Sequence, residues 1–320
     1  MRVGVGIDIG GSWLRVGLGD PHGNFLKKVV KKIVYGSAEG LLCSVASAIR
    51  EAAGAYLESL EGIGVGAAGR LDIKRGVLEY SPHASVKGIR LVEALEAEFS
   101  KPVVLLNDCV AAVIAEREAG VGKGLDDVVY VGIGTGIGGG AIVDGRILLG
   151  KDGNAHEVGH MIIDIDGRLE CSCGARGHWE AYTSGSGLPA FSRLLSEEYS
   201  GEKGLICRLR DGQMVEAKDI FSAAYCKDPF AEHILDKAAE INAIAFANLV
   251  SVYDPQLITV GGGVALKNPD LTIEPLVGRL PRACFNSPPS VKATPLGEDA
   301  PIIGALISAF DPIRSELRPE

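Results

Sequence analysis

The 320-residue sequence lacks several features that would place it in other classes of protein. Its longest apolar runs, such as residues 302–310, are too short to cross a bilayer, and no charged segment followed by a long apolar segment opens the chain. An excess of positive charge is missing, since the net charge is −9. The seven cysteines are an odd number, which argues against a disulfide framework. We therefore expect a cytoplasmic protein that binds neither membranes nor nucleic acid.

Two common nucleotide-binding motifs are also absent. Gly122-Lys123 resembles the end of a P-loop, but Gly124 follows where serine or threonine is required, and position 117 is an arginine. Residues 134–139 match G-x-G-x-x-G, but they do not open a convincing helix, which the dinucleotide-binding fingerprint needs. Any phosphate binding must therefore use other glycine turns.

The sequence does contain a supersecondary unit that occurs twice. Residues 3–27 hold three short apolar runs with a turn at Gly10-Gly11, and residues 128–149 repeat this plan with a turn at residues 134–136. Short β-rich runs separated by such turns are typical of antiparallel hairpins. Helical and strand patterns follow each copy.

This duplication predicts an α/β fold of two homologous lobes with a cleft between them. The smaller lobe is expected to comprise residues 1–108 and a returning segment, residues 299–320, and the larger lobe residues 109–298. A single large mixed sheet is the alternative.

Three glycine turns are candidates for holding a nucleotide. Adjacent glycines let backbone N–H groups approach an anion, and a carboxylate beside them can hold Mg²⁺ through water. Each turn taken alone is an ordinary tight turn, but three turns with one acid and two hydroxyls favour a nucleotide site. The candidate residues are Asp8, Gly10, Gly11, Ser12, Gly134, Thr135, Gly136, Gly261, Gly262 and Gly263.

Asp108 is the candidate catalytic acid. It follows Asn107 at the end of the apolar run 103–106 and precedes a helical pattern, so a helix N-cap is the alternative for this position. Phosphoryl transfer depends chiefly on positioning and charge neutralisation, with one carboxylate accepting the proton of the attacking hydroxyl. In that role Asp108 is the base and Asn107 contacts neighbouring hydroxyls.

A polyol substrate needs further paired donors and acceptors. These can come from Glu157, His160 and Glu180.

A short segment rich in glycine concentrates possible metal ligands. Cys171 and Cys173 are separated by one residue, and His160 precedes and His178 follows them. Zn²⁺ takes four such nitrogen and sulfur ligands in structural sites. The alternative is a pair of free buried cysteines and a hydrogen-bonded histidine. Residues 156–160 match H-E-x-x-H, but Val158-Gly159 makes a poor helix, so a metalloprotease site is not expected.

Together these residues resemble the ROK family (repressors, uncharacterised frames, sugar kinases), over nearly the whole chain. Residues 171–180 resemble the family's C-x-C-G-x-x-G-C-x-E signature, residues 156–160 its H-E-x-G-H segment, and residues 8–12 its D-x-G-G-T loop. The resemblance implies a two-lobed actin-like ATPase (ribonuclease H-like) fold with an interlobe cleft, and ATP and Mg²⁺ as cofactors.

The resemblance also implies roles for individual residues. Asp108 matches the catalytic base. Asn107, Glu157, His160 and Glu180 match the sugar contacts. The ligands of a structural zinc ion match His160, Cys171, Cys173 and His178. His178 stands where the family has a third cysteine, and Ser12 stands where it has threonine. A site of two histidines and two cysteines is acceptable to zinc; a weak or absent zinc is the alternative.

The activity that follows is an ATP-dependent transfer to a hexose 6-hydroxyl, of glucokinase or broad hexokinase type. A second hypothesis is a kinase of N-acetylglucosamine or N-acetylmannosamine. A sugar-responsive repressor is a third, but residue 3 already begins the first β-rich run and leaves no room for a DNA-reading head. A fourth is an ATPase without a sugar substrate, which has no reason to carry the segment 171–180. A homodimer is expected from the resemblance.

Overall fold

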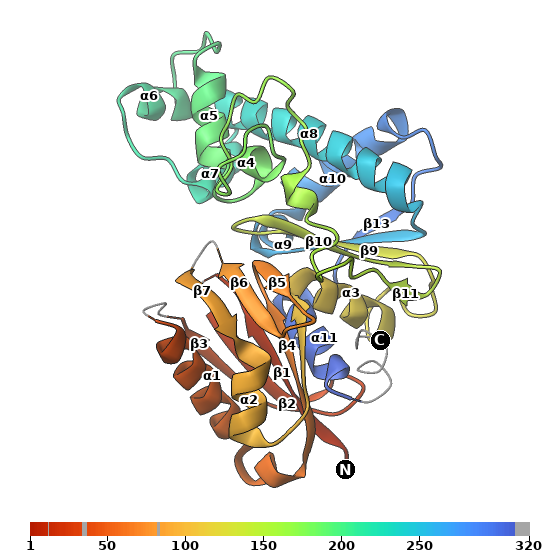
Figure 1. Cartoon of the computed structure of the whole chain (residues 1–320). Helices are drawn as coiled ribbons and strands as arrows, with labels where there is room; N and C mark the ends of the chain where they lie inside the picture. The colour runs from red at the N-terminus through yellow and green to blue at the C-terminus, as the bar shows by residue number, and fades with distance from the viewer. Residues whose placement is uncertain (12, 34–36, 82–83, 311–320) are drawn as a thin grey trace. The chain divides into compact units, whose positions relative to one another are not determined.

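The computed structural model describes residues 1–11, 13–33, 37–81 and 84–310 (Figure 1). The chain forms two units. The first contains Met1–Tyr130, Gly140–His156 and the described part of Thr294–Glu320, and the second contains Val131–Gly139 and Glu157–Ala293.

The first unit extends past the boundary expected at Asp108. Helix α3 (Asp108–Glu118) packs against the closing helix α11 (Ala300–Ser308), and both lie on the N-terminal sheet. Residues 109–118 therefore belong to the core of the first unit. The boundary expected from the sequence had placed them in the larger lobe.

The sheet of the first unit has the order β3-β2-β1-β4-β8. The first three strands form the expected antiparallel meander, β4 pairs parallel to β1, and β8 pairs parallel to β4. The strand bounds are β1 Val3–Ile9, β2 Trp13–Gly19, β3 Phe25–Lys32, β4 Leu60–Ala67 and β8 Val103–Asn107.

One face of this sheet is lined by glycine. Strand residues alternate between faces, so the pattern VGVGIDI puts Gly4 and Gly6 on one side and the apolar residues of β1 on the other. A Cβ on Gly6 would lie 2.5 Å from the carbonyl oxygen of Ile302, and one on Gly64 of β4 would lie 1.8 Å from that of Ala305. The absence of side chains lets α11 rest directly on the strand backbone.

The opposite face carries the larger side chains. Figure 1 shows helices α1 (Ala38–Ala53) and α2 (Leu91–Phe99) on this side of the strands, with α11 and α3 on the other. The apolar stripe of α1, including Leu41 and Val45, packs with the odd-numbered residues of β1 in one core. Ser37 caps α1 by accepting a hydrogen bond from the N–H of Gly40.

The remaining strands form two further sheets. A three-stranded antiparallel sheet of the first unit contains β5 (Arg70–Asp72), β6 (Val77–Ser81) and β7 (Ala84–Arg90), none of which the sequence predicted. A second five-stranded sheet has the order β11-β10-β9-β12-β13, so a single large mixed sheet is wrong. Its strands are β9 Val128–Ile133, β10 Ile137–Val143, β11 Arg146–Ile147, β12 Leu257–Gly261 and β13 Ser290–Ala293.

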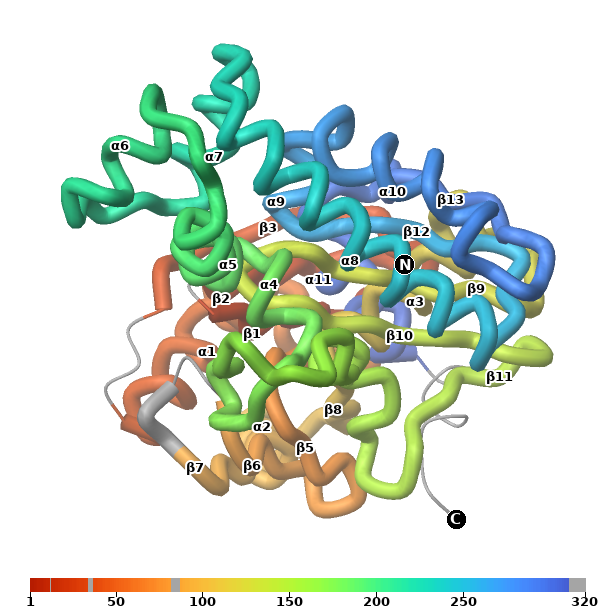
Figure 2. Tube along the Cα trace, turned by 90° about the horizontal axis from the view of Figure 1, so that it is seen from above, coloured from red at the N-terminus to blue at the C-terminus, as the bar shows by residue number. Residues whose placement is uncertain are grey.

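The second unit is mainly helical. Its long helix α8 runs beside α10, as Figure 2 shows, and a separate core forms where α8 packs with α4, α5, α6 and α7. The bounds are α4 Glu180–Thr183, α5 Leu188–Ser196, α6 Leu205–Arg210, α7 Ala217–Tyr225, α8 Pro229–Tyr253, α9 Gly263–Lys267 and α10 Pro269–Ala283.

Among the described residues, each helix is too short or too polar to span a membrane.

We predict that Gly64→Ala destabilises the first unit by about 3 kcal/mol, because the new methyl group would overlap the Ala305 carbonyl and push α11 from the sheet. Urea unfolding monitored by circular dichroism measures the change. Gly278→Ala is the matched control: Gly278 lies in α10 with open space where its Cβ would be, so it should gain about 0.5–1 kcal/mol. Equal effects of the two substitutions would contradict the close contact between α11 and β4.

Candidate active site

Two carboxylates of the first unit lie at one edge of its sheet. Strands β1, β4 and β8 are parallel neighbours, with Asp8 in register with Gly66 and Ala67 in register with Asn107. The carboxyl ends of parallel strands meet at the same edge. This places Asp8 and Asp108 near each other, and a Cβ on Gly66 would lie 3.5 Å from the Cα of Asp108.

Asp8 is a buried acid held by an arginine of the neighbouring strand. Arg15 of β2 is its register partner and donates from Nη1 to Asp8 Oδ2 over 2.9 Å. Burial, followed by the charge of Asp108, raises the pKa of Asp8 to about 7, although Arg15 acts in the opposite direction. Arg15 also donates from Nη2 to Glu298 Oε2 over 3.1 Å. The arginine therefore links the end of β1 to the segment that begins α11.

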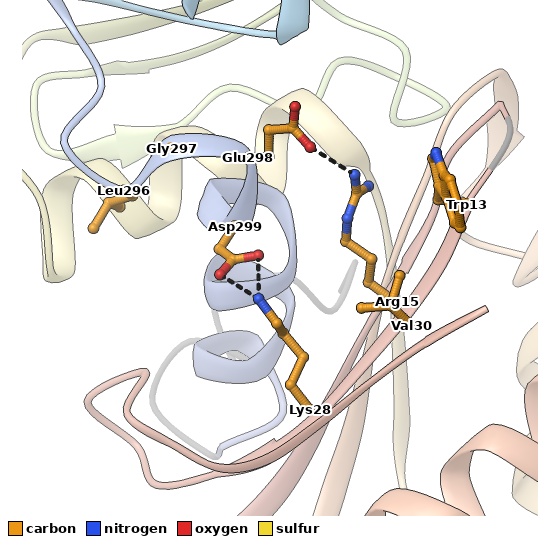
Figure 3. Close-up of a pocket in the computed structure, with 8 residues that line it drawn as sticks. All are labelled: Trp13, Arg15, Lys28, Val30, Leu296, Gly297, Glu298 and Asp299. Atoms are coloured by element: carbon orange, nitrogen blue, oxygen red, sulfur yellow. Dashed lines mark hydrogen bonds and ion pairs between the residues drawn. The ribbon is translucent and has the colours of Figure 1, made fainter. Parts of the chain in front are cut away.

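A hollow of about 540 Å³ opens beside this arginine (Figure 3). Two ion pairs cross it, Arg15 with Glu298 and Lys28 with Asp299, the latter at 2.7 Å. The ring of Trp13 is half exposed at its rim. Because each of these cations already faces a carboxylate, the described lining offers no unpaired charge to a ligand, and none of the expected site residues is among the described residues that line it.

Asn107, rather than Asp108, is the N-cap of α3. Its Oδ1 accepts from the N–H groups of Cys109 at 2.8 Å and Val110 at 3.3 Å. This leaves the Asn107 amide nitrogen as the group that could donate to a hydroxyl. Asp108 is the first helical residue and is partly exposed, and its Oδ1 accepts from the Cys109 N–H at 2.8 Å. The helix N-terminus favours the ionised carboxylate, the form a base requires.

The first glycine turn joins β1 to β2, as expected. The N–H of Gly10 donates to the carbonyl of Trp13 over 3.0 Å, and Gly10 and Gly11 are partly exposed. Ser12 lies outside the described residues. The turn follows Asp8 directly, so these candidate residues share the edge of the sheet that carries Asp108.

The other two glycine turns lie together in the second unit. Residues 134–136 join β9 to β10, and the Gly134 N–H donates to the Gly136 carbonyl over 2.9 Å. Gly262 has φ +85°, and a Cβ on it would lie 2.5 Å from the carbonyl carbon of Ile133. Only glycine permits both this backbone conformation and this approach. The structure therefore brings residues 261–263 beside residues 134–136.

The four expected metal ligands form one cluster. One donor atom from each of His160, Cys171, Cys173 and His178 lies within 4.8 Å of the others. The two Nδ1 atoms are 3.3 Å apart, His160 Nδ1 lies 3.8 Å from Cys171 Sγ, and His178 Nδ1 lies 3.3 Å from Cys173 Sγ. Tetrahedral zinc bonds of about 2.0–2.3 Å imply donor separations of about 3.3–3.8 Å. The donor set fits zinc in its chemistry, and these three pairs have the separations that a tetrahedral zinc site needs.

The electrostatics of the cluster suit neutral histidine ligands. Burial, then the neighbouring His160, lowers the pKa of His178. Burial raises the pKa of the Cys171 thiol to about 11. A metal ion must displace that proton, so metal binding releases protons and strengthens with pH.

His156, of the same sequence segment, lies outside this cluster. It is buried, and its Nε2 lies 2.7 Å from the Leu148 carbonyl. Residues 158–160 form a single 3₁₀ turn rather than the helix of a metalloprotease.

The expected sugar contacts of the second unit adjoin the cluster. His160 presents Nδ1 to the cluster and Nε2 toward Glu157, whose Oε2 is 3.6 Å away. Glu180 opens α4, where its Oε2 accepts from the Ile137 N–H at 2.9 Å and its Oε1 from the Ser172 hydroxyl at 3.0 Å. Neighbouring groups therefore already orient the side chains of His160 and Glu180.

The candidate residues thus form two groups, one within each unit. The first unit holds Asp8, Gly10, Gly11, Asn107 and Asp108. The second unit holds Gly134, Thr135, Gly136, Glu157, His160, Cys171, Cys173, His178, Glu180, Gly261, Gly262 and Gly263.

Three residues that support these groups, Arg15, Ser172 and Glu298, were not predicted from the sequence. Arg15 could have been found, because it stands opposite Asp8 across the Gly10-Gly11 turn and oppositely charged cross-strand pairs are favoured. Ser172 and Glu298 gave no such signal, since neither belongs to a strand or helix pattern that pairs it with Glu180 or with the distant Arg15.

Comparison with known proteins shows similarity along both units. The family model described as "ROK family" matches residues 4–311. A glucokinase of Aeropyrum pernix is 34% identical over 313 residues, which are 96% of this chain and 96% of that protein.

Two solved structures are also similar. A ROK family glucokinase from Streptomyces griseus, in complex with glucose and AMPPNP, has 32% identity and a TM-score of 0.80 over 96% of this chain and 99% of that chain. A ROK hexokinase from Thermus thermophilus has 30% identity and a TM-score of 0.82 over 96% and 98%.

We predict that Asp8→Asn changes how stability depends on pH. An acid whose pKa is higher in the folded chain binds more protons when folded, so it stabilises below about pH 4 and loses that contribution as the pH rises to about 7. Asparagine does not ionise, so the variant should exceed the parent chain in stability at pH 8 by about 4 kcal/mol, and the gain should vanish toward pH 4. Urea unfolding without Mg²⁺ at several pH values measures this. Parallel pH curves for both proteins would exclude the burial of an ionised Asp8.

Proposed function

Since the chain belongs to the ROK family, we propose that it is an ATP-dependent hexose kinase that phosphorylates the 6-hydroxyl of glucose or a related hexose. The family carries the two-lobed actin-like ATPase fold. The observation that carries the proposal is the position of Asp108, a partly exposed carboxylate at the first residue of a helix and beside the buried Asp8.

Asp108 is the proposed base. The loose transition state of phosphoryl transfer asks the protein mainly to position the hydroxyl and to accept its proton. The positive end of the α3 dipole interacts favourably with a carboxylate at this position, and capping by Asn107 fixes the backbone from which Asp108 projects. The nearby negative charge of Asp8 raises the proton affinity of the pair as a whole.

The nucleotide is assigned to the three glycine turns. Asp8 would hold the Mg²⁺ of MgATP through water, while Gly10, Gly11 and Ser12, together with residues 134–136, receive the phosphates. Residues 261–263 would lie against the base or ribose, because glycine backbone presents a flat surface. The magnesium ion supplies charge neutralisation on the phosphates when it is bound.

The sugar is assigned to polar groups of known orientation. Asn107 offers its amide nitrogen, and Glu157, His160 and Glu180 offer acceptors and donors to adjacent hydroxyls. In support, the Streptomyces griseus structure has glucose and AMPPNP bound. A zinc ion held by His160, Cys171, Cys173 and His178 would fix the loop from which Glu180 projects, a purely structural role.

Three further features remain proposals. The chain is proposed to form a homodimer, to act in the cytoplasm and not to bind nucleic acid. The acidic net charge of −9 supports the last of these.

The function is tested with the purified chain, MgATP and a panel of sugars: glucose, mannose, fructose, glucosamine and the N-acetylhexosamines. We expect the highest kcat/KM for glucose or another plain hexose. We also expect Asp108→Asn to lower kcat by at least about 100-fold while the affinities for ATP and sugar change little, because only proton transfer is lost.

Asp270→Asn is the matched control, an acid in the first turn of α10 that should keep full activity. Higher kcat/KM for an N-acetylhexosamine would replace the hexose assignment with the second hypothesis. ATP hydrolysis that ignores every sugar would refute the kinase. Normal turnover in Asp108→Asn would refute the base.

The metal site gives a separate prediction. Cys171→Ser should lower the zinc content of protein produced with zinc from about one ion per chain to near zero, and raise the sugar KM, because Glu180 loses its support. Metal analysis by mass spectrometry and sugar titration measure both effects. Cys226→Ser, at an exposed cysteine of the same unit, should change neither. A parent chain free of metal under these conditions would contradict the zinc site.

A further inference from the structure

One turn of the second unit holds the carbonyl groups of the glycine loop 134–136. The turn follows α4 and contains residues 184–187. The N–H of Gly185 donates to the Gly134 carbonyl over 2.8 Å. The N–H of Ser186 donates to the Thr135 carbonyl over 3.0 Å, and the Ser186 hydroxyl donates to the same oxygen over 2.8 Å.

These bonds decide which way the loop presents its N–H groups. The C=O of one residue and the N–H of the next point in opposite directions across a trans peptide, and the described chain has no cis peptide bond. Holding the carbonyls of Gly134 and Thr135 against the turn therefore directs the N–H groups of Thr135 and Gly136 away from it. Consecutive N–H groups that point to one side attract an anion, whereas carbonyl oxygens on that side would repel it.

The same segment also holds the far end of the loop. Glu180 lies at the start of α4, and its Oε2 accepts from the N–H of Ile137, the residue directly after the loop. Gly136 has no side chain, and a Cβ there would lie 2.4 Å from that Oε2. Three consecutive peptide groups, from Gly134 to Ile137, are thus hydrogen-bonded to residues 180–186.

The segment is itself rigidly anchored. Ser184 is buried. Its hydroxyl oxygen accepts a hydrogen bond from the Gly187 N–H at 2.9 Å and lies 3.1 Å from the Ser186 hydroxyl. Behind α4, the buried Trp179 and the Thr183 hydroxyl both donate to Asn242 Oδ1 of α8, at 2.8 and 2.7 Å. The turn is therefore preformed, and the loop is held by it.

We propose that residues 180–187 are a positioning brace for the loop 134–136, with Ser186 the positioning residue that keeps the loop's N–H groups turned toward a phosphate group. The inference rests on the proposed function in that the loop receives phosphates of ATP. It adds Ser186 as a determinant of nucleotide affinity. In the described residues, Ser186 bonds neither to the expected sugar contacts nor to the metal cluster.

The test is calorimetric titration of the full chain with a non-hydrolysable ATP analogue and Mg²⁺, and separately with glucose. Ser186→Ala should weaken nucleotide binding about fivefold, the effect of losing one hydrogen bond, and leave the glucose affinity within twofold. Ser186→Thr keeps the hydroxyl and should restore most of the nucleotide affinity. A merely structural role would shift both ligands together or neither.

Ser196→Ala is the matched control, because the Ser196 hydroxyl also donates to a backbone carbonyl, that of Arg193 at the end of α5. It should bind both ligands as the parent chain does. Unchanged nucleotide affinity in a folded Ser186→Ala, as judged by its thermal midpoint, overturns the brace. If that variant does not fold, Ser186→Gly also removes the hydroxyl and must show the same selective loss. A parent chain that binds no nucleotide at all would instead refute the proposed function.

Discussion

The close approach of α11 and α3 to a glycine-lined sheet face is the constraint on which the first unit depends. Gly6 and Gly64 leave no side chain between the strands and α11, so the helix backbone takes the place that a side-chain layer would occupy. Gly66 of β4 faces the start of α3, where a Cβ would lie 3.5 Å from the Cα of Asp108. This packing puts the first residue of α3, Asp108, close to the end of β1, where the side chain of Asp8 lies on the same face of the sheet as Gly4 and Gly6.

Burying Asp8 in that position opposes stability, and under the proposed function it prepares a place for a cation. Water is excluded from the carboxylate, and Asp108 adds a second negative charge, so ionisation is disfavoured and the pKa rises to about 7. Arg15 compensates part of this from the adjacent strand and is itself held by Glu298. A cation such as the magnesium of a nucleotide would relieve the remaining repulsion between the two acids. An unfavourable charge arrangement of this kind is typical of a site that awaits its ligand.

The second unit uses hydrogen bonds rather than buried charge to hold its groups. The cluster of His160, Cys171, Cys173 and His178 brings four side chains together just before α4. The Ser172 hydroxyl donates to one carboxylate oxygen of Glu180 and the Ile137 N–H to the other. The turn after α4 in turn holds the loop 134–136 through hydrogen bonds. The contacts form one continuous path from the cluster to the glycine loop, so a disturbance at either end has a physical route to the other.

The amino-acid sequence alone determined the elements whose evidence is local. Period-two alternation and glycine turns gave both meanders, and the spacing of two cysteines and two histidines gave the four members of the cluster that the structure brings within 4.8 Å. The tertiary structure decided what depends on partners distant in the chain: the membership of α3 in the first unit, the pair of Arg15 with Glu298, and the hold of Ser186 on Thr135. These escaped prediction because each depends on a contact between segments that packing alone brings together, and no local pattern of residue types records which segments will meet.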